Sequence, residues 1–262
     1  MVKKLLRSAY AWLIYFFLYA PIVVMVVMSF NASRSRTKWG GFSLDWYKAL
    51  FEDEAVFDAL SNTLWIAVLS STIATVIAIV AALVIFNTRN KPIKTIITQI
   101  TSLPMMNPDI VTGVSLMLLF IFFSIPRGFV SLLLAHITFN VPYVVTSILP
   151  RLRQMDRNIY EAALDLGAKP VQAFFKIILP QIMPGVITGM ILAFTLSIDD
   201  FIISFFTTGS GVSNLSIYIY SMTKRGISPE LYALSSLMFF VVLFLLIVVN
   251  FRLSPKKDKK ED

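Results

Sequence analysis

Six long apolar runs divide the sequence, and each is long enough to cross a membrane as a helix. They cover residues 10–30, 62–86, 93–123, 129–149, 182–206 and 231–251. A helix needs about 20 apolar residues to cross the hydrocarbon core of a bilayer. The runs are continuous rather than alternating, which excludes the strands of a membrane β-barrel. The pattern therefore predicts an all-α polytopic membrane protein with six transmembrane helices.

The third run is longer than one span requires, and it contains Pro104 and Pro108. Proline has no N–H to donate, and its ring collides with a carbonyl of the preceding turn, so we expect the helix to break beside Asp109. A break frees backbone carbonyls. In a membrane these are tolerated only inside protein or beside a water-filled cavity. The third run thus predicts a broken helix that lines a polar path.

Lysine and arginine are distributed unevenly among the segments between the runs. With the N-terminus inside, sixteen of the 23 basic residues fall on the inner side. Positive residues favour the cytoplasmic side, so we expect a multi-pass protein of the cell (inner) membrane with both termini in the cytoplasm. The first run has a basic start like a signal peptide, but it is too long for a signal core and lacks a small-x-small cleavage site. We interpret it as an uncleaved helix.

The composition narrows the function classes further. Hydrophobic residues make up 57% and charged residues 15%, against about a quarter charged in soluble domains. A soluble enzyme, a disordered chain and a coiled coil are excluded. The net charge of +8 is explained by topology, so we expect membrane lipids as partners and no nucleic acid. The chain has no cysteine and only one histidine, His136, so we expect neither a metal site nor a cofactor. His136 is interpreted as a helix contact, with a proton relay as the alternative.

The inner segment between the fourth and fifth runs predicts a helix-turn-helix. Residues 157–166 form an amphipathic pattern, and Gly167 follows as a helix C-cap. Pro170 is placed to start a second short helix at 171–178, and Pro180 is expected to end it before the fifth span. An ordinary amphipathic connector is the simpler alternative.

The spacing of residues in this segment resembles the EAA signature of ABC importer permeases. The match comprises Glu161, Ala162, Ala163, Gly167, Ile177, Leu179 and Pro180. The resemblance implies a type I ABC importer permease fold in which the loop 157–180 is a coupling helix that docks on an ATPase subunit. The chain has no phosphate-binding G-x-x-x-x-G-K-[ST] loop, so the nucleotide site must come from that partner.

Three acidic residues, Asp109, Asp199 and Asp200, lie within apolar runs. A carboxylate at the centre of a membrane helix costs about 2.5–3.5 kcal/mol, so such residues are functional candidates. On ideal helices Asp109 and Asp199 lie at a similar depth, about 25 Å from the inner end. Asp200 shares a face with Ser197, more than about 100° from the face of Asp199, unless the helix breaks nearby. The alternative is structural: ion pairing or a helix-end cap.

Carboxylates in a transport path favour cations over phosphate or sulfate, and a polyamine fits them well. Its ammonium groups can meet Asp109, Asp199 and Asp200, with Ser197 beside them, and its methylene stem can contact aromatic rings. Trp46 is a candidate for such a contact, with a membrane-interface anchor as the alternative.

Two further motifs narrow the resemblance. Residues 107–111 and 194–200 resemble the PotC-type permeases of spermidine/putrescine importers, and the likeness extends over nearly the whole chain. It implies an ATPase dimer, a second related permease and an extracytoplasmic polyamine-binding protein as partners. We expect one permease domain, 1–262, and the charged residues at its C-terminal end predict a solvated tail at 254–262.

Other functions remain open at this stage. A permease of the same superfamily could carry another small solute, such as ferric iron or an opine. An ion-coupled secondary transporter or channel could use the aspartates alone. A membrane enzyme would need a nucleophile or metal set that these residues do not supply, so no catalytic residue is assigned.

Overall fold

The structure is a computed structural model that describes residues 2–35, 38–209, 211–226 and 228–253, so the predicted tail 254–262 lies outside the described residues. Within these ranges all regular elements are helices, apart from one isolated bridge between Asn31 and Phe42. The prediction of an all-α protein is confirmed.

The chain forms two compact units, which are described separately. The first contains Met1–Asp58 and Tyr218–Val248, and the second contains Ala59–Ile217 and Val249–Asp262. Helices of the first unit are α1 (Val2–Ser29), α2 (Asp45–Glu52) and most of α11 (Leu215–Arg225) and α12 (Pro229–Leu253). Helix α3 (Glu54–Asn87) begins in the first unit and continues through the second.

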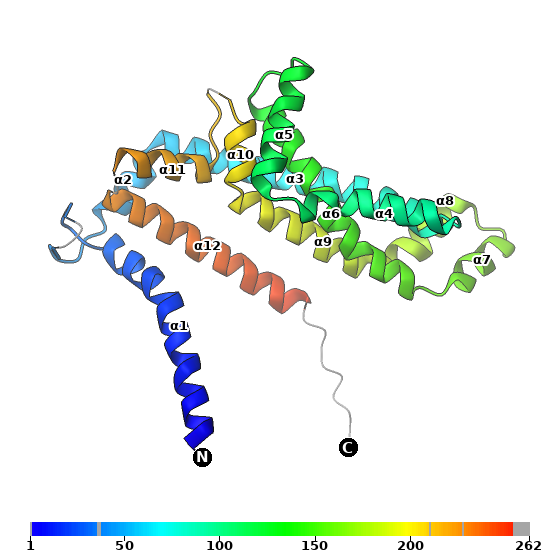
Figure 1. The fold of residues 1–262 in the computed structure, drawn as a ribbon, viewed down its shortest axis with the longest axis horizontal. Helices are drawn as coiled ribbons and strands as arrows, with labels where there is room; N and C mark the ends of the chain where they lie inside the picture. Colours follow the sequence, from blue (N-terminus) through cyan, green and yellow to red (C-terminus); the bar gives the residue numbers. More distant parts are fainter. Residues whose placement is uncertain (1, 36–37, 210, 227, 254–262) are drawn as a thin grey trace. The chain divides into compact units, whose positions relative to one another are not determined.

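The second unit holds the remaining helices. They are α4 (Lys91–Met106), α5 (Asp109–Phe122), α6 (Phe129–Gln154), α7 (Arg157–Asp165), α8 (Pro170–Ala173), the π-helical turn η1 (Phe174–Ile178), α9 (Leu179–Asp199) and α10 (Ile202–Thr207). Figure 1 shows α6 and α9 lying side by side, and these two helices form the main packing interface of the unit.

Each of the six apolar runs falls on helical structure. Four described helices are long and apolar enough to cross a membrane, and counting the bent pair α4–α5 as one span gives five. The apolar stretch Pro229–Phe244 within α12 corresponds to the sixth run. The chain is therefore a multi-pass membrane protein.

Small residues allow α6 and α9 to approach closely. A Cβ added at Gly185 would lie 2.8 Å from the carbonyl oxygen of Ser147, and one at Gly189 would lie 3.0 Å from Cα of Val144. Side chains of α3, α6 and α9 surround this contact in a buried cluster that includes Ala78, Ala82, Val144, Ile148, Ile182 and Val186. Gly185 and Gly189 are thus the helix-contact residues that their four-residue spacing indicates.

Candidate functional site

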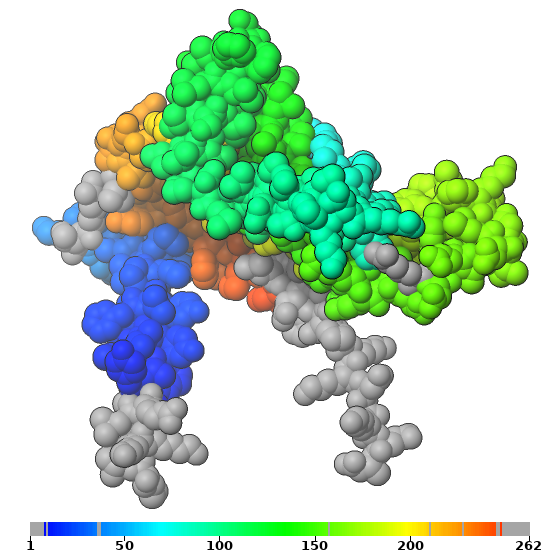
Figure 2. Space-filling model, turned by 45° about the vertical axis from the view of Figure 1, so that its right-hand side comes forward, coloured from blue at the N-terminus to red at the C-terminus, as the bar shows by residue number. Residues whose placement is uncertain are grey.

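The third predicted span breaks where the prolines indicated. Helix α4 ends at Met106, α5 begins at Asp109, and their axes are bent by 105°. Figure 2 shows the green α5 rising from the blue-green α4. Pro104 is accommodated within α4, so the break falls at Asn107 and Pro108, whose extended backbone stops the helix. Asp109 is consequently the exposed first residue of α5.

The fifth predicted span is also broken, between its two aspartates and a short terminal helix. Helix α9 ends at Asp199, Asp200 has an extended backbone, and α10 starts at Ile202. The carboxylate of Asp200 caps α10: its Oδ1 accepts the N–H of Ile203 at 3.2 Å, and its Oδ2 accepts the N–H of Ser204 at 2.7 Å. This is the helix-end cap that stood as the structural alternative for Asp200.

A buried polar cluster surrounds this cap. The hydroxyl of Ser204 donates to Oδ2 of Asp200 at 2.7 Å and accepts the side-chain amide of Asn214 at 2.7 Å. Nε2 of His136 lies 3.0 Å from the same hydroxyl oxygen and 3.6 Å from Asp200. Because the Ser204 proton points to Asp200, His136 donates from Nε2. His136 lies fully buried in a contact between α6 and α10, as the helix-contact interpretation predicts.

Ser197 belongs to a second buried cluster, one turn before the break. Its hydroxyl lies 3.0 Å from that of Ser70 on α3 and accepts the amide of Asn140 on α6 at 2.8 Å. Asn140 also donates to Ser70 at 3.2 Å. These bonds join three helices just below Asp199. Ser197 is 1% exposed, so its role here is to hold the end of α9 in place.

Asp109 and Asp199 differ from Asp200 in their surroundings. Both are exposed, and within the described ranges neither makes a hydrogen bond or an ion pair. Asp109 interacts electrostatically with Tyr143 of α6, a residue that the sequence analysis did not single out. The two breaks are connected through the helices that follow them, because α5 and α10 pack together. A Cβ added at Gly113 of α5 would lie 3.0 Å from the ring of Phe206.

Trp46 lies on α2 in the first unit. Its indole N–H donates to the carbonyl of Asn31 at 2.7 Å, and the guanidinium of Arg34 lies 5.8 Å from its ring centre. A cation therefore already occupies one side of this ring. In the same unit, the hydroxyl of Tyr218 of α11 donates to Asp53 at 2.8 Å. Burial and this hydrogen bond raise the pKa of Tyr218 to about 12, so Tyr218 stays neutral and ties α11 to the turn before α3.

The predicted helix-turn-helix is present. Helix α7 is capped by Asp156, whose carboxylate accepts the N–H of Asn158 at 2.9 Å; the preference of aspartate for this position is a signal that the sequence analysis overlooked. Gly167 has φ +87° and closes the helix, and the N–H of Ala168 reaches the carbonyl of Ala163 at 3.0 Å. Helix α8 starts at Pro170, as predicted.

The expectation for Pro180 is wrong. Pro180 does not end the second short helix, because the chain remains helical from Pro170 to Asp199 and Pro180 is the second residue of α9. The π-helical turn η1 precedes it, with Leu179 bonding to the carbonyl of Phe174 five residues earlier. This wider turn relieves the clash that a proline ring makes in an α-helix. The connecting segment is therefore continuous with the fifth span.

The residues that match the EAA signature lie on two sides of the helix-turn-helix. Glu161 and Ala162 are exposed on α7, and Pro180 is exposed at the start of α9. Ala163 and Ile177 are partly buried, and Leu179 packs against the main cluster of the unit. One side of the helix-turn-helix thus rests on the spans, and the other side is exposed.

Replacing Asp200 with alanine is expected to destabilise the fold. The change removes the cap of α10 and leaves the buried Ser204 without its acceptor, which should lower the free energy of unfolding by about 2–3 kcal/mol. Thermal unfolding in detergent, followed by tryptophan fluorescence, measures the effect. Asp199→Ala is the matched control and should change little. Equal unfolding midpoints for the two variants would contradict the structural role of Asp200.

Comparison with known proteins identifies a family of membrane transport components and two related permeases. Residues 74–258 match the family described as binding-protein-dependent transport system inner membrane component. The chain is 40% identical over 260 residues to the spermidine/putrescine transport system permease protein PotC of Escherichia coli (strain K12), covering 99% of this chain and 97% of that protein. It is 42% identical over 228 residues to the putrescine transport system permease protein PotI of the same strain, covering 84% and 81%.

Solved structures show the same fold at low sequence identity. A bacterial ABC transporter involved in the import of the acidic polysaccharide alginate matches with a TM-score of 0.72 and 18% identity, covering 97% of this chain and 96% of that chain. An inward-facing MetNI methionine ABC transporter matches with a TM-score of 0.63 and 16% identity, covering 77% and 97%. The substrates named for these structures differ, so they support the architecture only.

Proposed function

Because the chain belongs to the family of binding-protein-dependent transport system inner membrane components, we propose that it is the permease subunit of an ATP-driven ABC importer for polyamines. The near full-length identity to a permease named for spermidine and putrescine supports this substrate class. The geometric observation that carries the proposal is the placement of Asp109 and Asp199, two exposed carboxylates at helix breaks, each without a basic partner among the described residues.

Asp109 and Asp199 act as acceptors for the ammonium groups of the substrate. The charge of Asp109 acts on Tyr143 of α6, so Tyr143 is a further candidate contact for the same cation, through the attraction between a cation and an aromatic ring. Asp200 and Ser197 act indirectly, because their hydrogen bonds fix the end of α9 and the start of α10. Trp46 contributes at the outer loop, where a polyamine would displace or join Arg34 at its ring.

Movement is supplied by other subunits through the helix-turn-helix. An ATPase dimer docks on α7, through Glu161, Ala162 and the turn at Gly167, and changes the tilt of α9. The continuous helix from Pro170 to Asp199 supports this coupling, because a rigid rod carries a displacement of its inner end to the carboxylate at its outer end. The permease itself performs no covalent chemistry and holds no cofactor.

The proposed assembly contains four kinds of subunit. Residues 1–262 form one permease domain with both termini in the cytoplasm, and a second homologous permease completes the path. An extracytoplasmic binding protein delivers the polyamine to the outer loops. The identity of the family, whose description names binding-protein-dependent transport, supports these partners.

Radiolabelled spermidine uptake into vesicles that contain all subunits tests this function. Uptake is expected only with ATP on the side of the ATPase, and excess unlabelled putrescine should compete while phosphate should not. Uptake driven by an ion gradient without the ATPase would instead show a secondary transporter. ATP-dependent transport of ferric iron or an opine, with no competition from polyamines, would show that the substrate class is wrong.

A further inference from the structure

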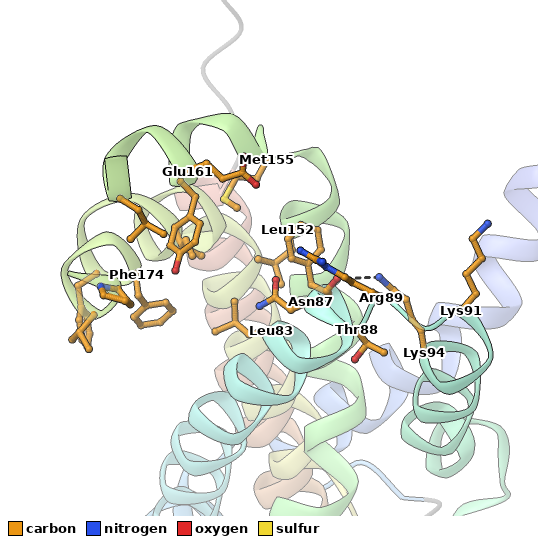
Figure 3. A pocket seen from close by; sticks show the side chains of 17 residues that line it. Leu83, Asn87, Thr88, Arg89, Lys91, Lys94, Leu152, Met155, Glu161 and Phe174 are labelled. Carbon is orange, nitrogen blue, oxygen red and sulfur yellow. Dashed lines mark hydrogen bonds between the residues drawn. The ribbon is translucent and has the colours of Figure 1, made fainter. Parts of the chain in front are cut away.

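A large cleft opens at the inner end of the second unit, away from the two helix breaks. Its volume is about 1220 Å³. One side is formed by the end of α3 and the start of α4, and the other by α7, α8 and η1, as Figure 3 shows. Most of its lining is apolar, including Leu83, Phe86, Leu152, Leu164, Phe174 and Ile178. A cleft of this size and character can hold an amphipathic molecule.

The charged groups of the cleft are concentrated on the α3–α4 side. Arg89, Lys91 and Lys94 lie there, whereas the one acidic residue of the lining, Glu161, comes from α7 (Figure 3). Nζ of Lys94 donates to the carbonyl of Phe86 at 3.1 Å, which fixes the ammonium and leaves it two more N–H donors. Arg89 and Lys91 are exposed. Arg89, Lys91 and Lys94 therefore form a basic rim, which is suited to binding an anion.

The position of the basic rim along α3 points to the membrane surface. The apolar run of α3 ends at Phe86, and the basic residues follow within a few positions. In the proposed orientation they lie at the headgroups of the cytoplasmic leaflet. Anionic lipids are enriched in that leaflet and are attracted by basic residues beside a transmembrane helix.

A second hollow extends the cleft along the outer face of α3. It measures about 400 Å³ and shares Leu83, Asn87 and Thr88 with the cleft. Its other lining residues are Val80 and Val84, which are 59% and 53% exposed. Val84 and Val80 lie about one and two turns before Thr88, nearer the membrane interior, so this hollow offers an apolar track that begins at the basic residues. A headgroup with an attached acyl chain matches both parts.

We propose that the cleft binds an anionic phospholipid, with its phosphate at Arg89 and Lys94 and an acyl chain along Val80 and Val84. The wall opposite the phosphate is α7, so the bound lipid would bridge the spans to the coupling segment. A cation-binding path near the aspartates and an anion site at the inner end are chemically distinct. This site is therefore independent of the polyamine assignment.

Photolabelling of the assembled transporter tests the site without requiring transport. The complex in detergent is incubated with phosphatidylglycerol that carries a photoreactive group on one acyl chain, and labelled peptides are mapped by mass spectrometry. The phosphatidylglycerol probe is expected to label the α3 segment more strongly than the matching phosphatidylcholine probe does. The double variant Arg89→Gln, Lys94→Gln should reduce this labelling about tenfold, because each basic residue adds to the attraction for anionic headgroups. Arg153→Gln, an exposed inner residue outside the cleft, should leave it unchanged.

Three outcomes would overturn the assignment. Equal labelling by phosphatidylcholine would show unselective contact with the bilayer. Displacement of the probe by excess inorganic phosphate would indicate a site for a soluble anion. Labelling that appears only when the ATPase is omitted would show that this subunit fills the cleft.

Discussion

Spermidine uptake by the reconstituted complex is expected to fall about tenfold or more when Asp109 or Asp199 is replaced with asparagine, because a hydrogen bond to a charged group contributes about 1.5–3 kcal/mol. Asparagine keeps the size of the side chain and removes only its charge. Neither carboxylate has a hydrogen-bonded partner among the described residues, so the substitution leaves no described group without its acceptor. The loss should therefore appear in the initial uptake rate rather than in the unfolding midpoint.

Asp45→Asn is the matched control for these variants. Asp45 is an exposed carboxylate in the first turn of α2, outside the membrane runs, and its change should leave uptake near the wild-type rate. Unchanged uptake by both Asp109→Asn and Asp199→Asn would discard the carboxylate path. A loss in only one variant would keep a single acceptor site and remove the other.

Gly167→Val is expected to reduce ATP-driven uptake about tenfold or more, because the left-handed backbone that closes α7 costs an L-residue about 1–2 kcal/mol, and a β-branched side chain more. Gly167 has φ +87°, and a Cβ there would meet no atom within 4 Å. Any effect therefore comes from the backbone and not from a clash. Relaxation of the turn would rotate α7 relative to α8 and misplace Glu161 and Ala162. Membrane insertion should be normal, since the turn lies outside the spans.

The control for this prediction is Gly167→Asn. Asparagine tolerates the left-handed conformation at a helix C-cap, so most uptake should remain. Uptake is measured together with ATP hydrolysis stimulated by the loaded binding protein, which separates uncoupling from loss of assembly. Wild-type uptake by Gly167→Val would rule out coupling through this turn.

The membrane-spanning helices, the helix break before Asp109 and the turn at Gly167 were predictable, because each depends on residues close together in the sequence. Twenty consecutive apolar residues define a span, and Pro108 marked the break before Asp109 because proline limits its neighbours wherever it occurs. Gly167 and Pro170 marked the turn and the start of α8 for similar reasons. Pro180 shows the limit of such local rules. Its effect depended on the π-helical turn before it, which helix propensity does not predict.

Asp199 is exposed whereas Asp200 is held by hydrogen bonds, and this difference could not be predicted because it depends on distant parts of the chain. Asp200 is fixed by Ser204 four residues later, but the hydroxyl of Ser204 also binds His136, 68 positions earlier in the sequence. Asp199 has no such contacts and remains exposed. Helical periodicity placed the two carboxylates on different faces but could not say which face was buried. Nor could it indicate that Tyr143 interacts electrostatically with Asp109.

The sequence by itself determined that this chain crosses the membrane several times, where its third helix breaks, and that residues 157–178 form a helix-turn-helix. These properties follow from apolar length, proline geometry and residue spacing, all of which act within about 20 residues. Only the tertiary structure decided which aspartate is a structural cap, that α5 and α10 pack together, and that a cleft with basic residues on one side adjoins the helix-turn-helix. Each of these requires groups from separate helices to come within a few ångströms, and no local pattern specifies that distance.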